Sequence, residues 1–144
     1  MTAPGLVVLS PREADVFACF ADAVVAPTGS MLSISRSGAV ERFDAWLVAA
    51  SPLERTGLRG ALWAIEIAPL LSGSGGRLRR LGVERRRAFI DGMRFAPLAV
   101  LIRLFCSAAR LCYYSNDEIM RELGYDPETV LARGRKLRKR EQRW

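Results

Sequence analysis

The sequence contains no histidine and, among its 22 basic residues, only two lysines. Histidine is the commonest general base near neutral pH and the commonest ligand for zinc, copper or non-haem iron, so its absence excludes Ser-His and Cys-His nucleophile pairs. Both lysines, Lys136 and Lys139, lie in a strongly basic stretch, where a solvated ammonium group keeps its proton. We therefore predict that the chain is not an enzyme by itself and holds no metal or cofactor of its own.

Cysteine is also scarce, with three residues in the chain. Cys106 and Cys112 lie six residues apart on one predicted helix, and therefore on different faces, while Cys19 is remote in sequence. The odd count and the wide spacing argue against both a disulfide framework and a metal pair. We expect ordinary thiols that pack as small hydrophobic side chains.

Export and membrane signals are missing as well. The N-terminus carries neither a basic n-region nor a twin arginine, and the apolar run Leu6–Leu9 is too short for a signal peptide. The longest apolar stretch, residues 97–114, is interrupted by Arg103 and Arg110, and a charged residue at mid-bilayer costs about 2.5–3.5 kcal/mol. We interpret this stretch as a buried helix and expect a cytoplasmic protein without a transmembrane segment.

What the sequence does contain is typical of one packed domain followed by a basic end. Half of the 144 residues are hydrophobic and 26% are charged. Residues 133–144 carry a charge of +6 out of a net +7, which leaves only +1 for residues 1–132. We therefore divide the chain into a helical domain, residues 1–132, and a basic C-terminal tail, residues 133–144.

Two segments carry a complete signal for the start of a helix. Ser10-Pro11-Arg12-Glu13 and Ser51-Pro52-Leu53-Glu54 each combine a capping serine, a proline at the first helical position and a glutamate that closes the capping box. Apolar spacing and further caps predict helices over about 11–25, 38–50, 52–70, 83–95, 97–114, 117–123 and from 127 onward. The predicted fold is all-α, a compact bundle of about six helices around two apolar central helices, residues 52–70 and 97–114.

Glu66 is unusual because it lies in the middle of the apolar helix predicted over residues 52–70. One interpretation is a buried acid with a raised pKa. The sequence favours the other, an ion pair with an arginine such as Arg59, Arg103 or Arg110, or exposure on the narrow polar side of the helix. Because the helix has few polar residues, we expect it to be the most enclosed element after the helix over residues 97–114.

The basic tail has three interpretations that the sequence leaves open. The favoured one is a solvated, partly disordered terminus that aids solubility or docks on an acidic protein surface. The arginines could instead neutralise the phosphates of nucleic acid or acidic lipid head groups. Leu131 and Trp144 are too far apart to form a continuous apolar face, which argues against an in-plane membrane anchor.

The second half of the chain carries an ordered set of short motifs. These are residues 84–89 (ERRRAF), the apolar helix that begins at Pro97, residues 111–117 (LCYYSND) and residues 120–125 (MRELGY). This order resembles the helical small subunit or N-terminal helical region of glucose-methanol-choline (GMC) flavin oxidoreductases. Similar stretches occur in the small subunit of gluconate 2-dehydrogenase-type enzymes and in long-chain alcohol oxidases, and the resemblance extends over most of residues 9–127.

The resemblance implies a noncatalytic accessory subunit that binds and stabilises, or completes, a larger flavin-dependent oxidoreductase. Here the Gly-Tyr of residues 124–125 is followed by Asp126-Pro127 and a basic helix rather than by a flavin domain. The FAD is therefore expected in a separate partner chain, with none bound by this one.

Aromatic residues and an arginine are the candidates for contacting such a partner, because these types most often carry interface energy. Tyr113 and Tyr114 are adjacent on a helix, so their side chains diverge by about 100°, and we expect one to pack inward and the other to reach a partner. The candidate contact residues are Tyr113, Tyr114, Tyr125 and Arg121, with Trp46 and Trp63 as weaker candidates for which filling of the core is the favoured interpretation.

Two other functions stay open at this point. One is a small basic helical protein that binds nucleic acid through residues 133–144 or regulates it. The other is a self-assembling helical interaction protein with no enzyme partner.

Overall fold

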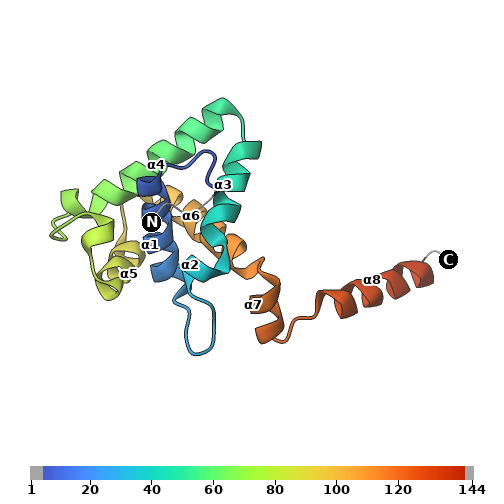
Figure 1. Cartoon of the computed structure of the whole chain (residues 1–144). Helices are drawn as coiled ribbons and strands as arrows, with labels where there is room; N and C mark the ends of the chain where they lie inside the picture. The colour runs from blue at the N-terminus through green and yellow to red at the C-terminus, as the bar shows by residue number, and fades with distance from the viewer. Residues whose placement is uncertain (1–4, 142–144) are drawn as a thin grey trace.

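The computed structural model describes residues 5–141, which form eight α-helices, one 3₁₀ helix and no strand (Figure 1). The predicted all-α fold is confirmed. The elements are α1 (Pro11–Val25), α2 (Ile34–Ser37), α3 (Ala39–Ala49), α4 (Pro52–Leu71), the 3₁₀ helix η1 (Leu78–Arg80), α5 (Val83–Gly92), α6 (Ala96–Tyr114), α7 (Asp117–Glu122) and α8 (Pro127–Glu141).

Both complete helix-start signals form the expected capping boxes. At the start of α1 the Ser10 N–H donates to Glu13 Oε2 (2.8 Å), and the Glu13 N–H donates to Ser10 Oγ (3.4 Å). Ser51 and Glu54 exchange the same two bonds at the start of α4. These local bonds satisfy N–H groups that lack a partner within the helix, so the short sequence signal alone determines where each helix begins.

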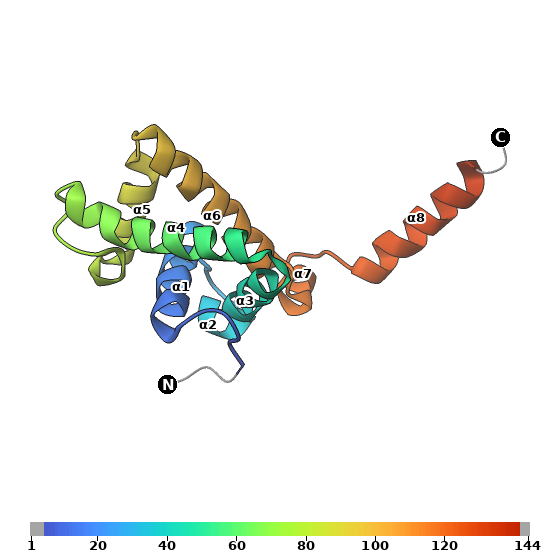
Figure 2. The ribbon, with the colours of Figure 1, turned by 90° about the horizontal axis from the view of Figure 1, so that it is seen from above.

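The core is built around α1, which packs against α2, α3, α4, α5, α6 and η1. The Phe17 and Phe43 rings stack with their centroids 4.1 Å apart, and Phe105 from α6 lies 5.8 Å from Phe43. Ala21 is fully buried, and its small side chain lets neighbouring helices approach α1 closely. The centre of the bundle is thus shared between α1 and the two apolar helices α4 and α6, which lie next to each other (Figure 2).

Helix ends differ from the prediction where proline and glycine are involved. α4 ends at Leu71, one residue beyond the predicted end, and includes Pro69, which lacks the N–H for one hydrogen bond of the helix. α5 ends at Gly92 rather than at Phe95, and Met93 is extended so that a new helix begins before Pro97. The segment predicted as a loop over residues 28–37 contains the short helix α2.

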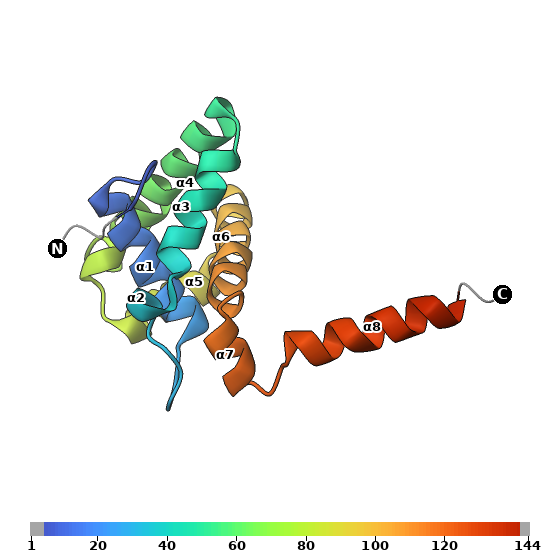
Figure 3. The same ribbon diagram turned by 45° about the vertical axis from the view of Figure 1, so that its right-hand side comes forward.

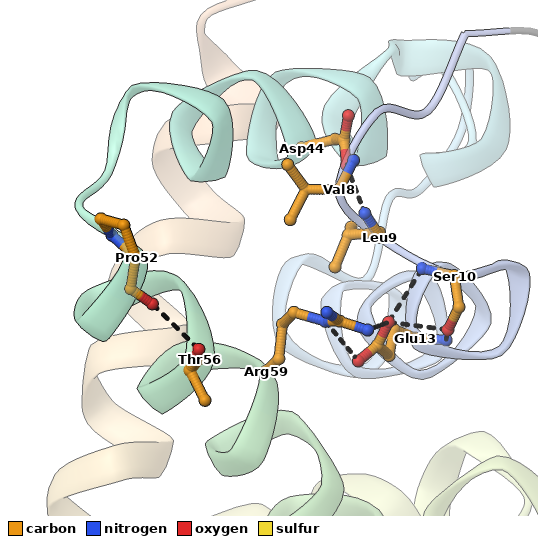
Figure 4. Close-up of polar contacts among 8 residues, drawn as sticks. All are labelled: Val8, Leu9, Ser10, Glu13, Asp44, Pro52, Thr56 and Arg59. Atoms are coloured by element: carbon orange, nitrogen blue, oxygen red, sulfur yellow. Dashed lines mark hydrogen bonds and ion pairs between the residues drawn. The ribbon is translucent and has the colours of Figure 1, made fainter.

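The N-terminal segment is held by a side chain of α3 rather than by strand pairing. The Asp44 carboxylate accepts the backbone N–H groups of Val7 (2.7 Å), Val8 (3.0 Å) and Leu9 (2.7 Å). Figure 4 shows Asp44 with two of these donors, Val8 and Leu9. Asp44 is buried, although its place in the sequence put it largely off the apolar face of its helix.

The C-terminal part of the chain leaves the bundle after α7. Gly124 adopts the left-handed conformation (φ +78°) that the sequence predicts, and the N–H of Tyr125 donates to the carbonyl of Met120. α8 then projects away from the other helices (Figure 3). It includes residues 127–132 as well as residues 133–141 of the basic tail, whose last three residues lie outside the described part of the chain.

Candidate functional site

Buried carboxylates are candidates for acid–base chemistry, and Glu13 is one of them. Arg59 donates to both of its oxygens, Nε to Oε1 at 2.8 Å and Nη2 to Oε2 at 3.1 Å, and Ser10 donates twice more (Figure 4). Burial by itself raises the pKa of Glu13, but the hydrogen bonds from Arg59 and Ser10 outweigh it, so the pKa is lowered from its ordinary value. Glu13 is therefore an ionised structural group with its oxygens occupied.

Glu66 is fully buried and ion-paired, as the sequence favours, but with a different arginine. The Arg79 guanidinium Nε lies 3.0 Å from Glu66 Oε1, and the Arg79 backbone N–H donates to Oε2 at 3.2 Å. The expected partners Arg59, Arg103 and Arg110 are thus wrong. The sequence missed Arg79 because the tight 3₁₀ turn after the glycine-rich loop, which carries it back onto α4, has no signal as clear as a capping box.

The cysteines offer no reactive thiol. Burial raises the pKa of Cys112 to about 11, and burial also raises the pKa of Cys19 and Cys106, so all three thiols stay protonated near neutral pH. Cys112 is buried and the other two are half-buried. Within residues 5–141 there is no group of three or more cysteines and carboxylates placed to hold a metal ion.

The outer side of α4 is exposed to solvent although it carries no charged residue. Exposed residues recur along it every three or four positions, and none of them is charged: Leu53, Gly57, Gly60, Ala64, Ile67 and Leu71. Leu53 and Leu71 are 84% and 83% exposed. The sequence prediction that α4 is among the most enclosed elements is therefore wrong, because only its inner side is covered.

α6 continues this apolar surface. Its exposed Pro97, Val100, Leu104 and Leu111 follow the same helical spacing, and the exposed Arg103 borders this stripe, about 60° around the helix from Val100. We call the outer stripe of α4, these four residues of α6 and the groove between the helices the α4–α6 face.

The groove in the α4–α6 face has a volume of about 620 Å³. Ile67 and Leu71 form one side, Phe95 and Leu98 the other, and Ser72 is the one polar residue in its lining. A second depression of about 580 Å³ continues along α4 past Gly57, shares Leu101 with the first and has the charged Glu54 at its lining. Aligned exposed apolar residues of this kind mark interaction sites, whereas singly scattered ones are ordinary.

α6 is also the one helix among the described residues that is long and apolar enough to cross a membrane, by length and composition alone. Only 28% of its most apolar stretch is buried. The sequence interpretation of residues 97–114 as a buried helix thus holds for one side of α6 only, and the expected lack of a transmembrane segment stays a prediction.

The candidate contact residues do not form one surface. Tyr113 takes the inward position, fully buried, with its hydroxyl donating to the Leu32 carbonyl at 2.6 Å. Tyr114 is half-buried against it, with the two rings edge to face and their centroids 5.2 Å apart. The others lie on separate elements: exposed Trp46 on α3, half-buried Trp63 on α4, exposed Arg121 on α7, and exposed Tyr125 just after α7.

With this geometry established, comparison with known proteins adds nothing to it. No family model, curated protein or solved structure matches the chain. Function must therefore be argued from the α4–α6 face, the charges and the sequence motifs.

Proposed function

We propose that this protein is a noncatalytic accessory subunit that binds a larger FAD-dependent, GMC-type oxidoreductase through the α4–α6 face. The observation that carries the proposal is the outer side of α4, on which the recurring exposed residues are all uncharged. An exposed helix in water normally carries polar residues on its outer side, and a helix that is apolar all round is normally enclosed. A second polypeptide would supply the missing enclosure.

Two further observations support a binding role over a catalytic one. The buried carboxylates Glu13, Asp44 and Glu66 are each held by donors from their own chain, so none is poised to move a proton for a substrate. The cysteine thiols stay protonated near neutral pH. The nature of the partner rests on the resemblance of residues 84–127 to the helical region of GMC enzymes.

The test is co-purification with the flavin-dependent oxidoreductase encoded nearest to this protein in its genome. We expect a stable complex by size-exclusion chromatography at micromolar concentration. The double variant Ile67→Glu, Leu104→Glu places two carboxylates in the apolar face, and we expect it to weaken the complex by about 100-fold or more, since each buried unpaired charge costs several kcal/mol.

The matched control is Val83→Glu at the start of α5, because Val83 is 39% exposed and Ile67 is 38% exposed. We expect this variant to bind like the unmodified chain. The proposal is wrong if no complex forms, if the control weakens it equally, if the isolated chain turns over substrate, or if the α4–α6 face is occupied by a second copy of the same chain.

A further inference from the structure

α8 contains more charged residues than any other helix of the chain, and it is placed differently from the other helices. Figures 1 and 3 show it projecting away from the packed helices. The residues of α8 whose burial is described are exposed, apart from Gly134, which is half-buried. A helix of this length, 15 residues, is marginally stable in water without tertiary packing, so its stability depends on local interactions and on whatever binds it.

Local interactions stabilise the beginning of α8 and destabilise its end. Asp126 accepts the Glu128 N–H at 3.1 Å and the Thr129 hydroxyl, and the hydrogen bonds from Thr129 and Glu128 lower the pKa of Asp126. Further along, like charges stand three residues apart, as in the pairs Arg133–Lys136 and Arg135–Arg138. Each such pair costs about 0.2–0.5 kcal/mol, which a ligand rich in negative charge would remove.

The positions of the charges indicate the shape of that ligand. With about 100° between successive residues, the basic positions from Arg133 to Arg138 cover about 220° of the helix circumference. Leu137, Val130 and Gly134 form an apolar stripe about 60° wide, and Arg138 separates this stripe from the exposed Leu131, which lies about 60° beyond Gly134. A membrane surface or a flat acidic protein surface contacts one side of a helix, and an in-plane membrane helix needs a broad apolar face. A ligand that surrounds the helix fits the pattern better.

We propose that α8 binds duplex DNA by lying in the major groove, with its basic side chains on the phosphates of both groove walls. The major groove of B-form DNA is about 12 Å wide and admits an α-helix, whereas the deep, narrow major groove of A-form RNA does not. Three of the four basic residues with described side chains are arginines, whose planar guanidinium groups match phosphate geometry. This binding is independent of base sequence and goes beyond the proposed function.

Fluorescence anisotropy with a labelled 24-base-pair DNA duplex of mixed sequence tests the proposal. With six phosphate contacts, we expect the affinity to fall roughly 10³-fold between 50 and 200 mM salt. The variant Arg133→Gln, Arg135→Gln, Lys136→Gln, Arg138→Gln removes four contacts, so we expect the slope of log affinity against log salt to become shallower by about 3.6. Addition of DNA should also increase the helical circular dichroism signal of the unmodified chain.

The matched control removes four exposed arginines of the packed helices, Arg12→Gln, Arg36→Gln, Arg85→Gln and Arg103→Gln, and changes the net charge by the same amount. It should leave most of the salt slope in place. An equal loss in this control, no binding at 50 mM salt, or equal or tighter binding to an RNA duplex or to vesicles containing anionic lipid would overturn the proposal.

The two proposals fail independently. The four-site α8 variant should still bind the oxidoreductase, and the Ile67→Glu, Leu104→Glu variant should still bind DNA with unchanged salt dependence. If either variant abolishes both activities, the two surfaces are not separate, and the assignment of α8 to DNA is wrong.

Discussion

α1 and α4 are helices of the same packed unit, and each buries one glutamate, but the exposed side of α1 carries charged residues whereas most of the exposed side of α4 is uncharged. In α1, Arg12 and Asp15 are exposed and the phenylalanines are buried. In α4, Glu66 is buried and Arg59 binds a buried carboxylate, while apolar residues such as Leu71 are exposed.

The two helices differ in the kind of residue that they expose to solvent. α1 has the ordinary arrangement of a helix with one side in the core and the other in solvent. Arg59 and Glu66 of α4 bind α1 and η1. Arg55 donates to carbonyls of α3 and Glu54 caps the start of α4, so the outer stripe of α4 carries no charge. Among the described residues, the inner side of α4 is covered by the core and its outer stripe is exposed.

Two isoleucines on opposite sides of α4 give the most sensitive test of whether its outer side is exposed in the isolated chain. Ile65 is fully buried and Ile67 is 38% exposed. We expect Ile65→Lys to lower the free energy of unfolding by about 4 kcal/mol or more, because the ammonium group would be buried without a partner. Ile67→Lys should change it by less than about 0.5 kcal/mol. Urea denaturation measures both, and similar losses would show that the outer side of α4 is covered within the isolated chain.

Removal of the buried Glu66 carboxylate of α4 should have the next largest effect on the free energy of unfolding. Glu66→Ala leaves Arg79 without its buried partner, and we expect a loss of about 3 kcal/mol in the free energy of unfolding. Asp15→Ala is the control, because the exposed Asp15 carboxylate lies 3.7 Å from the same arginine and a surface pair of this kind contributes about 0–1 kcal/mol. If both variants lose the same amount in urea titrations, Glu66 has no special role in joining α4 to η1.

The smallest effect is the dependence on pH of the contact between α1 and α4. The pKa of Glu13 is lowered in the folded chain, so its ionised form adds stability above its unfolded pKa, and this is lost as pH falls below about 4.5. We expect Glu13→Gln to lower the free energy of unfolding by about 2 kcal/mol at pH 7. The difference from the unmodified chain should shrink as the pH falls below about 4.5 in denaturation curves. A difference that is constant over this range would contradict the assignment.

Local signals in the sequence predicted most of the secondary structure, but the sequence did not predict the polar contacts between residues far apart in the chain. The Ser-Pro-x-Glu motifs at Ser10 and Ser51 predict helix starts correctly, because every bond of a capping box lies within four residues. The partner of Glu66 depends on how the loop after α4 returns, and the partner of Glu13 lies 46 residues away. No periodicity in the sequence encodes such distances.

The candidate contact surface was missed for a related reason. An apolar residue on a helix predicts burial, but it does not specify whether the covering atoms belong to the same chain. Ile65 and Ile67 are the same residue type on the same helix, and only the position of α6 and of the rest of the core decides which one is covered. Tyr113 illustrates the opposite case: the 100° divergence from Tyr114 predicted that one of the two would be internal, and the hydrogen bond to Leu32 shows which.

The Asp44 carboxylate also defines where the folded chain has to start. It receives three consecutive amide hydrogens from residues 7–9, so a shortened protein that begins at Val7 keeps every donor, whereas one that begins at Ser10 leaves a buried negative charge with no counterpart. The minimal boundary for expressing this unit is therefore dictated by a residue more than thirty positions downstream.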